Sequence, residues 1–262
     1  TDSTIKIIEK YHELVRGNKF PIKCKGVSLT FISDKDNGMY DAINKGFASS
    51  TGNIMAWINC DDFFLPMAFS KISKVFTEYP EVTWLKGITA IVNPETGIIN
   101  HQACSLFNQD WIEKGIYGRY LYFINQDSVF WKKELWQRAG PIKEGLRLAG
   151  DYYLWANMAK HTPLYSLNSE VSCYRNLKES LGQKNMARYR KEQEEVVPIK
   201  GSLLEAKIKL FFGLRKKTKY LLPTFIINSI YKYIFGNINI PYFELNKSGQ
   251  LIKKFSSLPE IK

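Results

Sequence analysis

One stretch of the sequence carries most of the information about the fold. Residues 36–64 read DNGMYDAINKGFASSTGNIMAWINCDDFF. A glycine turn is followed by a helical pattern, a short apolar strand and two adjacent carboxylates, Asp61 and Asp62. Because open α/β sheets present their ligands at the carboxyl ends of strands, this order predicts a binding site at the two aspartates. A carboxylate pair can hold a divalent cation against a phosphate group.

The sequence on either side of this stretch alternates between helical and strand patterns. The periodicity predicts helices over residues 3–16, 39–50, 66–79, 132–139 and 151–160. It predicts strands over residues 27–33, 54–59, 82–92, 98–103, 128–131, 164–167 and 171–175. The segment Asn93–Gly97 has the composition of a hairpin turn. This alternation favours an α/β fold with a mostly parallel, mixed sheet and helices on both faces.

The composition changes near residue 198, where we predict a domain boundary. Residues 1–198 would form the main domain, and residues 199–262 a helical, basic and aromatic extension with helices over 203–214 and 221–235. Residues 201–262 hold 11 Lys and Arg against 3 Asp and Glu, so most of the net charge of +12 lies there. Such a segment favours an anionic partner, such as a membrane surface or a phosphorylated substrate. A nucleic acid is disfavoured, because no recognisable binding motif interleaves aromatic with basic residues.

The cysteines and the hydropathy indicate where the chain functions. The four cysteines are far apart and form no CxxC motif, which fits a reducing compartment. No run of about 18 apolar residues, the length that spans a bilayer, occurs in the sequence. We therefore predict a cytoplasmic protein, at the inner face of the cell membrane if the basic segment binds lipid. The chain opens directly on Thr1–Thr4, a helix-capping pattern, so we expect the sequence to begin partway through a domain.

Two further positions are candidates for chemistry. Asp151 lies between Gly150 and an aromatic run, where it could cap a helix or act as a general base whose pKa partial burial raises. Asp61 and Asp62 could likewise only cap the helix predicted from residue 66. Arg175 ends a strand and is the best candidate of a basic run to meet a phosphate. The other members, for which a solvated helix face is the better interpretation, are Lys178, Lys184, Arg188 and Arg190.

Four motifs together resemble a known family. They are DNGMYDAINKGF at 36–47, TGNIMAWINCDDFF at 51–64, INQDSVFWKKELWQRAG at 124–140 and GDYYLW at 150–155. In this order and spacing they resemble the family 2 glycosyltransferases, inverting enzymes with a Rossmann-like GT-A fold that use nucleotide sugars. The resemblance spans roughly residues 1–176. It implies sugar transfer to a hydroxyl acceptor, a sugar or a lipid-linked sugar, in the synthesis of a bacterial surface polysaccharide or glycolipid.

The resemblance also implies roles for individual residues. Asp61 and Asp62 match the motif that binds Mg²⁺ or Mn²⁺ and the donor diphosphate, and Asp151 matches the base that deprotonates the acceptor. Residues expected to line the nucleotide-sugar donor are Asp36, Gly38, Asp41, Asn44 and Lys45. Gln126 and the segment around Trp131 match the acceptor side.

The sequence also departs from the family pattern. Asn59 stands where many members have an aspartate, so we do not count it as a metal ligand. The first strand, helix and second strand of the family, which hold much of the nucleobase site, have no counterpart here. This departure keeps open an alternative function, a non-catalytic transferase domain that binds a partner or a membrane.

Overall fold

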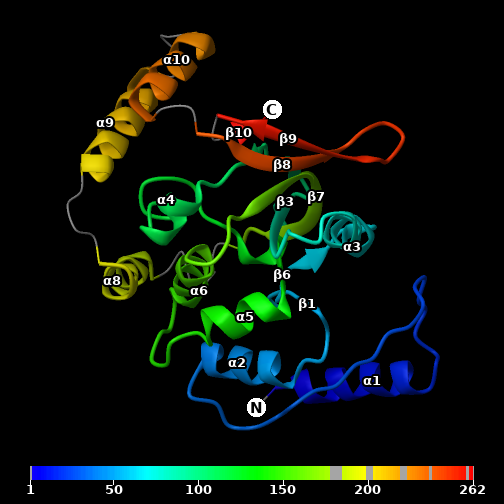
Figure 1. Ribbon diagram of the computed structural model, residues 1–262. Coiled ribbons are helices and arrows are strands. Elements are labelled where there is room, and N and C mark those ends of the chain that lie inside the picture. The colour runs from blue at the N-terminus through cyan, green and yellow to red at the C-terminus, as the bar shows by residue number, and fades with distance from the viewer. Residues whose placement is uncertain are drawn as a thin grey trace.

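One mixed sheet forms the centre of the molecule. The computed structural model describes residues 2–177, 185–198, 203–218, 223–235, 238–257 and 260–261, and Figure 1 shows how they are arranged. The strands follow the order β1–β6–β3–β7–β8–β9, with β2 paired to β7 and β4 to β3. The pairs β3–β7 and β7–β8 are parallel and the other pairs are antiparallel. A separate two-stranded sheet joins β5 to β10.

The strands differ widely in length. The long ones are β3 (Trp84–Val92) and β7 (Tyr165–Arg175) at the centre, and β8 (Ile240–Leu245) and β9 (Leu251–Ser256) beside them. The short ones are β1 (Ile54–Met55), β2 (Phe63–Phe64), β4 (Ile99–Asn100), β5 (Cys104–Ser105), β6 (Val129–Lys132) and β10 (Glu260–Ile261).

Helices cover both faces of the sheet. They are α1 (Thr4–Arg16), α2 (Met39–Ser49), α3 (Ala68–Glu78), α4 (Gln109–Glu113), α5 (Lys133–Ala139), α6 (Gly150–Ala159), α8 (Met186–Val196), α9 (Leu203–Thr218) and α10 (Thr224–Phe235). A 3₁₀ turn, η1 (Gln126–Ser128), precedes β6. None of the helices in the described segments is long and apolar enough to cross a bilayer.

The alternation of side chains along the strands explains the two layers. Leu85 and Phe130 pack with α3 on one face, whereas their neighbours Trp84 and Trp131 pack with α2, α5 and α6 on the other. This is the period of two that a strand buried on both faces requires. The predicted fold class, an α/β fold with a mixed sheet and helices on both faces, is therefore confirmed. The expectation that the sheet is mostly parallel is wrong, because among the described strands only β3–β7 and β7–β8 pair in parallel.

The predicted strand over residues 27–33 is wrong. These residues form neither helix nor strand. Val27 is 47% exposed and Ile32 is 64% exposed. A strand needs a neighbour to accept its backbone hydrogen bonds, and no strand in the described part of the chain pairs with this segment. The β-branched residues alone could not form the element.

The C-terminal segment holds more than the predicted helices. α9 and α10 confirm the helical pattern, but β8 and β9 were not predicted, and β8 extends the central sheet beside β7. The strands predicted over 164–167 and 171–175 are one continuous strand, β7. Lys178 and Lys184 of the basic run and residues 199–202 at the predicted boundary lie outside the described residues.

Candidate active site

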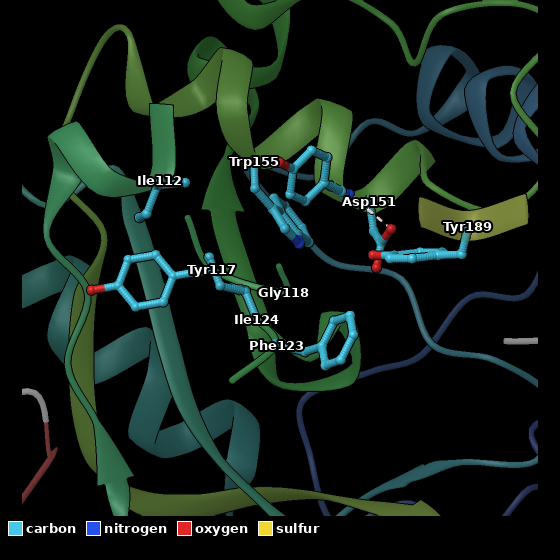
Figure 2. Close-up of a pocket in the computed structure, with 9 residues that line it drawn as sticks. Ile112, Tyr117, Gly118, Phe123, Ile124, Asp151, Trp155 and Tyr189 are labelled. Carbon is cyan, nitrogen blue, oxygen red and sulfur yellow. Dashed lines mark hydrogen bonds between the residues drawn. The ribbon is translucent and has the colours of Figure 1, made fainter. Parts of the chain in front are cut away.

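Asp151 lies in an aromatic pocket at the start of α6. The pocket is lined by Phe123, Trp155 and Tyr189, together with Ile112, Tyr117, Gly118, Ile124 and Tyr152. Figure 2 shows the carboxylate beside the ring of Tyr189. Its Oδ1 accepts a hydrogen bond from the Tyr152 backbone N–H at 2.7 Å. Burial raises the pKa of Asp151 from 3.8 to about 6, against the smaller opposing effect of this N–H. A carboxylate with this pKa is suited to accept a proton near neutral pH.

The rings around Asp151 divide into a buried wall and an accessible rim. Tyr117, Tyr152 and Trp155 are buried, whereas Phe123 is 41% exposed and contacts Tyr189 edge-on at 5.8 Å between ring centroids. The space they leave next to Asp151 is about 20 Å³. That is room for about one water molecule. The space beside Asp151 therefore admits one hydroxyl-sized group.

Trp131 lies in the core and not in this pocket. It has no exposed surface, and its ring packs against Phe47 at 5.4 Å and Trp155 at 5.6 Å between centroids. The residue expected on the acceptor side thus supports Trp155 from behind. Gln126, the other residue expected there, directly follows the Phe123–Asn125 segment, and its Nε2 is buried without a hydrogen-bond partner among the described residues.

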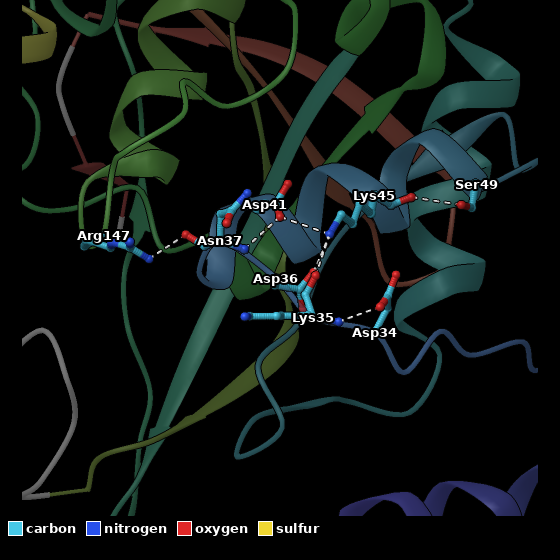
Figure 3. A network of polar contacts seen from close by, with 8 residues as sticks. All are labelled: Asp34, Lys35, Asp36, Asn37, Asp41, Lys45, Ser49 and Arg147. Carbon is cyan, nitrogen blue, oxygen red and sulfur yellow. Dashed lines mark hydrogen bonds and ion pairs between the residues drawn. The ribbon is translucent and has the colours of Figure 1, made fainter.

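The loop before α2 and the first turns of that helix form a polar network (Figure 3). Lys45 Nζ contacts Asp36 Oδ1 at 2.8 Å and Asp41 Oδ2 at 3.0 Å. Asp41 Oδ2 also accepts the Asn37 backbone N–H at 2.9 Å. That N–H and then Lys45 lower the pKa of Asp41. A pocket of about 260 Å³ lies beside this network and is lined by both Asp36 and Lys45. Three of the residues predicted for the donor side therefore lie together.

Gly38 and Asn44 have structural partners. Gly38 adopts φ +119°, which favours glycine, and a Cβ there would lie 1.9 Å from Arg147 Nη1, so any other residue would also displace the end of the Arg147 side chain. Arg147 Nη1 donates to the Asn37 carbonyl at 2.6 Å, as Figure 3 shows. The Asn44 amide exchanges two hydrogen bonds with the backbone of Ile142, at 2.8 and 2.9 Å. Asn44 therefore holds the loop after α5, and these bonds explain its position without a ligand.

Asp62 has one carboxylate oxygen with a partner and one without. Oδ1 accepts the Arg175 backbone N–H at 3.0 Å, and the Arg175 guanidinium lies over the Phe63 ring, 5.5 Å from its centroid. Oδ2 is buried without a hydrogen-bond partner among the described residues. Burial, followed by repulsion from Asp127 and Asp61, raises the pKa of Asp62 to about 6 although the Arg175 N–H opposes the shift. A buried acceptor without a partner is costly unless a ligand satisfies it.

A buried polar cluster lies behind Asp62. Asp127 is 1% exposed and accepts a hydrogen bond from the Ser172 hydroxyl. Burial raises the pKa of Asp127, and burial lowers that of the nearby Lys86, whose Nζ donates to the Gly87 carbonyl at 2.9 Å. Asp127 belongs to the segment 123–127, which runs from the Asp151 pocket to the Asp62 motif. Asp127 stands in the polar turn Gln126–Ser128 before β6, and nothing in that local sequence indicates its burial.

The carboxylates fit a divalent cation only together with a ligand. Among the described residues, no group of three or more His, Cys, Asp or Glu could hold a metal ion alone. Mg²⁺ is usually held by one or two carboxylates and completed by substrate phosphates and water. Asp61, which is partly exposed, and the free Oδ2 of Asp62 have the chemistry for such a shared site.

The family model "Glycosyl transferase family 2" matches residues 1–133, which is just over half of the 262 residues. The chain is a family 2 glycosyltransferase. It is 25% identical over 203 residues to the amylovoran biosynthesis glycosyltransferase AmsE of Erwinia amylovora. The aligned residues make up 76% of this chain and 74% of AmsE.

The fold agrees with solved structures. The crystal structure of S. aureus TarS residues 1–349 matches 84% of this chain with a TM-score of 0.51 and 12% identity. The same protein in complex with UDP-GlcNAc matches with a TM-score of 0.53 and 15% identity. The chain spans about 60% of the length of these structures. At such low identity the likeness to TarS concerns the GT-A fold alone. The transfer of sugars is indicated by the match to the family model.

Proposed function

We propose that this glycosyltransferase transfers a sugar from a nucleoside diphosphate sugar to an acceptor hydroxyl, with inversion at the anomeric carbon. The observation that carries the proposal is Asp151, a carboxylate with a pKa near 6 in an aromatic pocket. Asp151 takes the proton of the acceptor hydroxyl, and the resulting oxygen attacks the anomeric carbon. The bond between that carbon and the diphosphate breaks on the opposite face. The nucleoside diphosphate keeps the electron pair, and the configuration inverts.

The donor would bind between the α2 network and the aspartate pair. Asp36 and Lys45, which line the adjoining pocket, would contact the donor, and the Arg175 guanidinium is a candidate partner for phosphate oxygens. Asp61 and Asp62 would hold Mg²⁺ or Mn²⁺, whose charge would offset that of the departing diphosphate. The role in surface-polysaccharide synthesis is supported by the similarity to AmsE.

The experiment is a nucleotide-sugar panel, beginning with UDP-GlcNAc because TarS binds it. Release of nucleoside diphosphate is measured with and without acceptor sugars, and the anomeric configuration of any product is determined by NMR. Transfer should be lost in D151N and in D62N. Transfer that persists in both variants would reject the proposed mechanism.

A second candidate, a domain that binds without catalysis, is favoured by the N-terminal region. α1 has no buried residue, and residues 27–33 form no strand. A donor site framed by such exposed elements could be too loosely held to turn over. Calorimetric titration with UDP and GDP separates the two functions. Binding without transfer to any acceptor would favour the second candidate.

The exposed side of α9 and α10 fits the proposed contact with the inner face of the cell membrane. Leu203 is 74% exposed, Leu210 63% and Tyr233 92%, and Lys207 and Lys232 are exposed beside them. Apolar side chains flanked by lysines bind anionic lipid surfaces. The protein should sediment with phosphatidylglycerol vesicles and not with phosphatidylcholine vesicles, and the double variant L210E/Y233E should lose this binding. Equal sedimentation of the variant would contradict the contact.

A further inference from the structure

The backbone of Arg147–Ala149, just before the catalytic base, is held by one carboxylate. Glu192 Oε2, on α8, accepts the backbone N–H groups of Arg147 at 3.0 Å, Leu148 at 2.8 Å and Ala149 at 3.0 Å. These three bonds span more than 40 residues of sequence. Asp151 follows two residues after Ala149. The position of the base is therefore tied to α8.

The Glu192 carboxylate is buried and both of its oxygens have partners. It is 7% exposed, and its other oxygen, Oε1, faces Arg188 Nε at 3.3 Å. Burial opposes ionisation of the carboxyl, but the three N–H groups and Arg188 together lower its pKa, so the group is an anion at neutral pH. A buried carboxylate that accepts three backbone N–H groups forms strong, charge-assisted hydrogen bonds.

The segment that Glu192 holds also contacts the donor side. The Leu148 carbonyl accepts the Tyr40 hydroxyl at 2.7 Å, and the Tyr40 ring packs against Gly150. Arg147 Nη1 holds the Asn37 carbonyl at 2.6 Å. Arg147–Gly150 thus connects α2 and the loop before it to the first turn of α6.

We propose that Glu192 is a positioning residue for sugar transfer: it fixes Arg147–Ala149, and through this segment it sets the position of Asp151 relative to the donor loop. The inference rests on the proposed function, because positioning matters only if Asp151 is the base. Glu192 does not touch the reacting atoms. It acts through backbone N–H groups that would otherwise be free to move.

Three other contacts keep α8 docked while Glu192 is changed. Arg190 Nη1 donates to the Gly118 carbonyl at 2.5 Å, Arg119 Nη2 to the Val197 carbonyl at 2.6 Å, and Tyr189 packs on Phe123. A substitution of Glu192 should therefore release the 147–149 segment without detaching the helix. This makes the residue testable by itself.

The test compares E192A and E192Q with E195Q, a control on the exposed side of the same helix, where the Glu195 side chain is 58% exposed. A displacement of the base by about 1 Å costs about 10²-fold in rate. E192A should lower kcat by roughly 10- to 100-fold with little change in the donor KM. E192Q keeps an acceptor oxygen and should recover part of the loss, and E195Q should match the wild type. A residue with a merely structural role would instead lower kcat in proportion to the folded fraction, without rescue by Gln.

Amide hydrogen exchange on the full chain without substrate provides a readout independent of activity. In E192A the amides of Arg147, Leu148 and Ala149 should exchange faster, while those in the second half of α6 stay protected. Unchanged exchange, or an unchanged kcat in E192A, would overturn the inference. If the wild type transfers no sugar, the proposed function fails, and the exchange result alone decides whether Glu192 holds the segment. If E192A does not fold, E192Q is judged by the same exchange criterion.

Discussion

Replacing Asp151 by Asn should remove activity and increase stability. The ionised carboxylate is unfavourable where it lies, since burial raises its pKa from 3.8 to about 6. One pKa unit corresponds to about 1.4 kcal/mol, so the shift corresponds to roughly 3 kcal/mol at most. Asn has no charge to bury. D151N should therefore be more stable than the wild type by up to about 3 kcal/mol at pH 8, which corresponds to a rise in Tm of roughly 6–12 °C.

The pH dependence follows from the direction of the shift. Because the pKa of Asp151 is higher in the folded than in the unfolded state, the folded protein holds the proton more tightly between pH 3.8 and about 6. Burial of Asp151 thus costs the wild type no stability below pH 3.8. The wild type loses stability relative to D151N as the pH rises from 3.8 to about 6, and the difference is constant above that pH. The other titrating groups are present in both proteins and cancel in the comparison. The difference in stability should shrink to a small fraction of its pH 8 value near pH 4.

The assay is thermal unfolding at pH 8 and near pH 4, together with sugar transfer at pH 8. D110N is the matched control, because Asp110 lies on a helix, its side chain is 55% exposed and it pairs with Lys114. The control should differ from the wild type by no more than about 0.5 kcal/mol at either pH. D151N should transfer sugar at least about 10²-fold more slowly. A variant no more stable than the wild type at pH 8, or a gain that persists undiminished near pH 4, would refute the reasoning.

Three further outcomes are expected. G150A should lower the Tm, since a Cβ there would lie 2.5 Å from the Tyr40 ring, and overpacking of about 1–3 kcal/mol exceeds the gain of 0.5–1 kcal/mol that Ala brings to a helix; an unchanged Tm would show that the ring can move. EDTA should abolish transfer and Mg²⁺ or Mn²⁺ should restore it in the wild type. D62N should not recover, whereas the control D110N, changed at an exposed aspartate, should. Transfer that is unaffected by EDTA would exclude the cation. F123A should raise the acceptor KM by roughly fivefold, as expected for the loss of an aromatic contact of about 1 kcal/mol, and leave the donor KM unchanged; equal effects on both would place Phe123 outside the acceptor site.

The sequence predicted the elements that local patterns define. α2, α3, β3, α5 and α6 were expected within about two residues of their observed bounds, because each has a clear apolar period and a turn or cap signal. The prediction of a strand at 27–33 was wrong because a strand forms only beside a pairing partner, and the local sequence carries no information about that partner. β8 was missed because Pro241 lies within it and argues against a strand, although its neighbours pair with β7 and β9.

The candidate site shows the same limit. Asp61, Asp62 and Asp151 could be chosen from motifs, and Gly38 from its turn. Glu192 could not be chosen, since in the sequence it is one carboxylate in a charged helix. Its importance comes from three backbone N–H groups more than 40 positions away. Trp131 is the opposite case. Its place in a motif suggested a role on the acceptor side, but in the fold its ring is fully buried.

The small space next to Asp151 has a consequence for substrate choice. A sugar ring does not fit into about 20 Å³, so under the proposed function the body of the acceptor would rest on the exposed Phe123 ring, which contacts the buried ring of Tyr189. Tyr189 belongs to α8, whereas the predicted donor residues Asp36 and Lys45 lie at α2 and the loop before it. Under the proposed function the two substrates would thus meet different parts of the chain, and Arg147–Gly150 is the segment that contacts both parts. We infer that substitutions on α8 alter the acceptor that is used, and leave the choice of nucleotide sugar to α2.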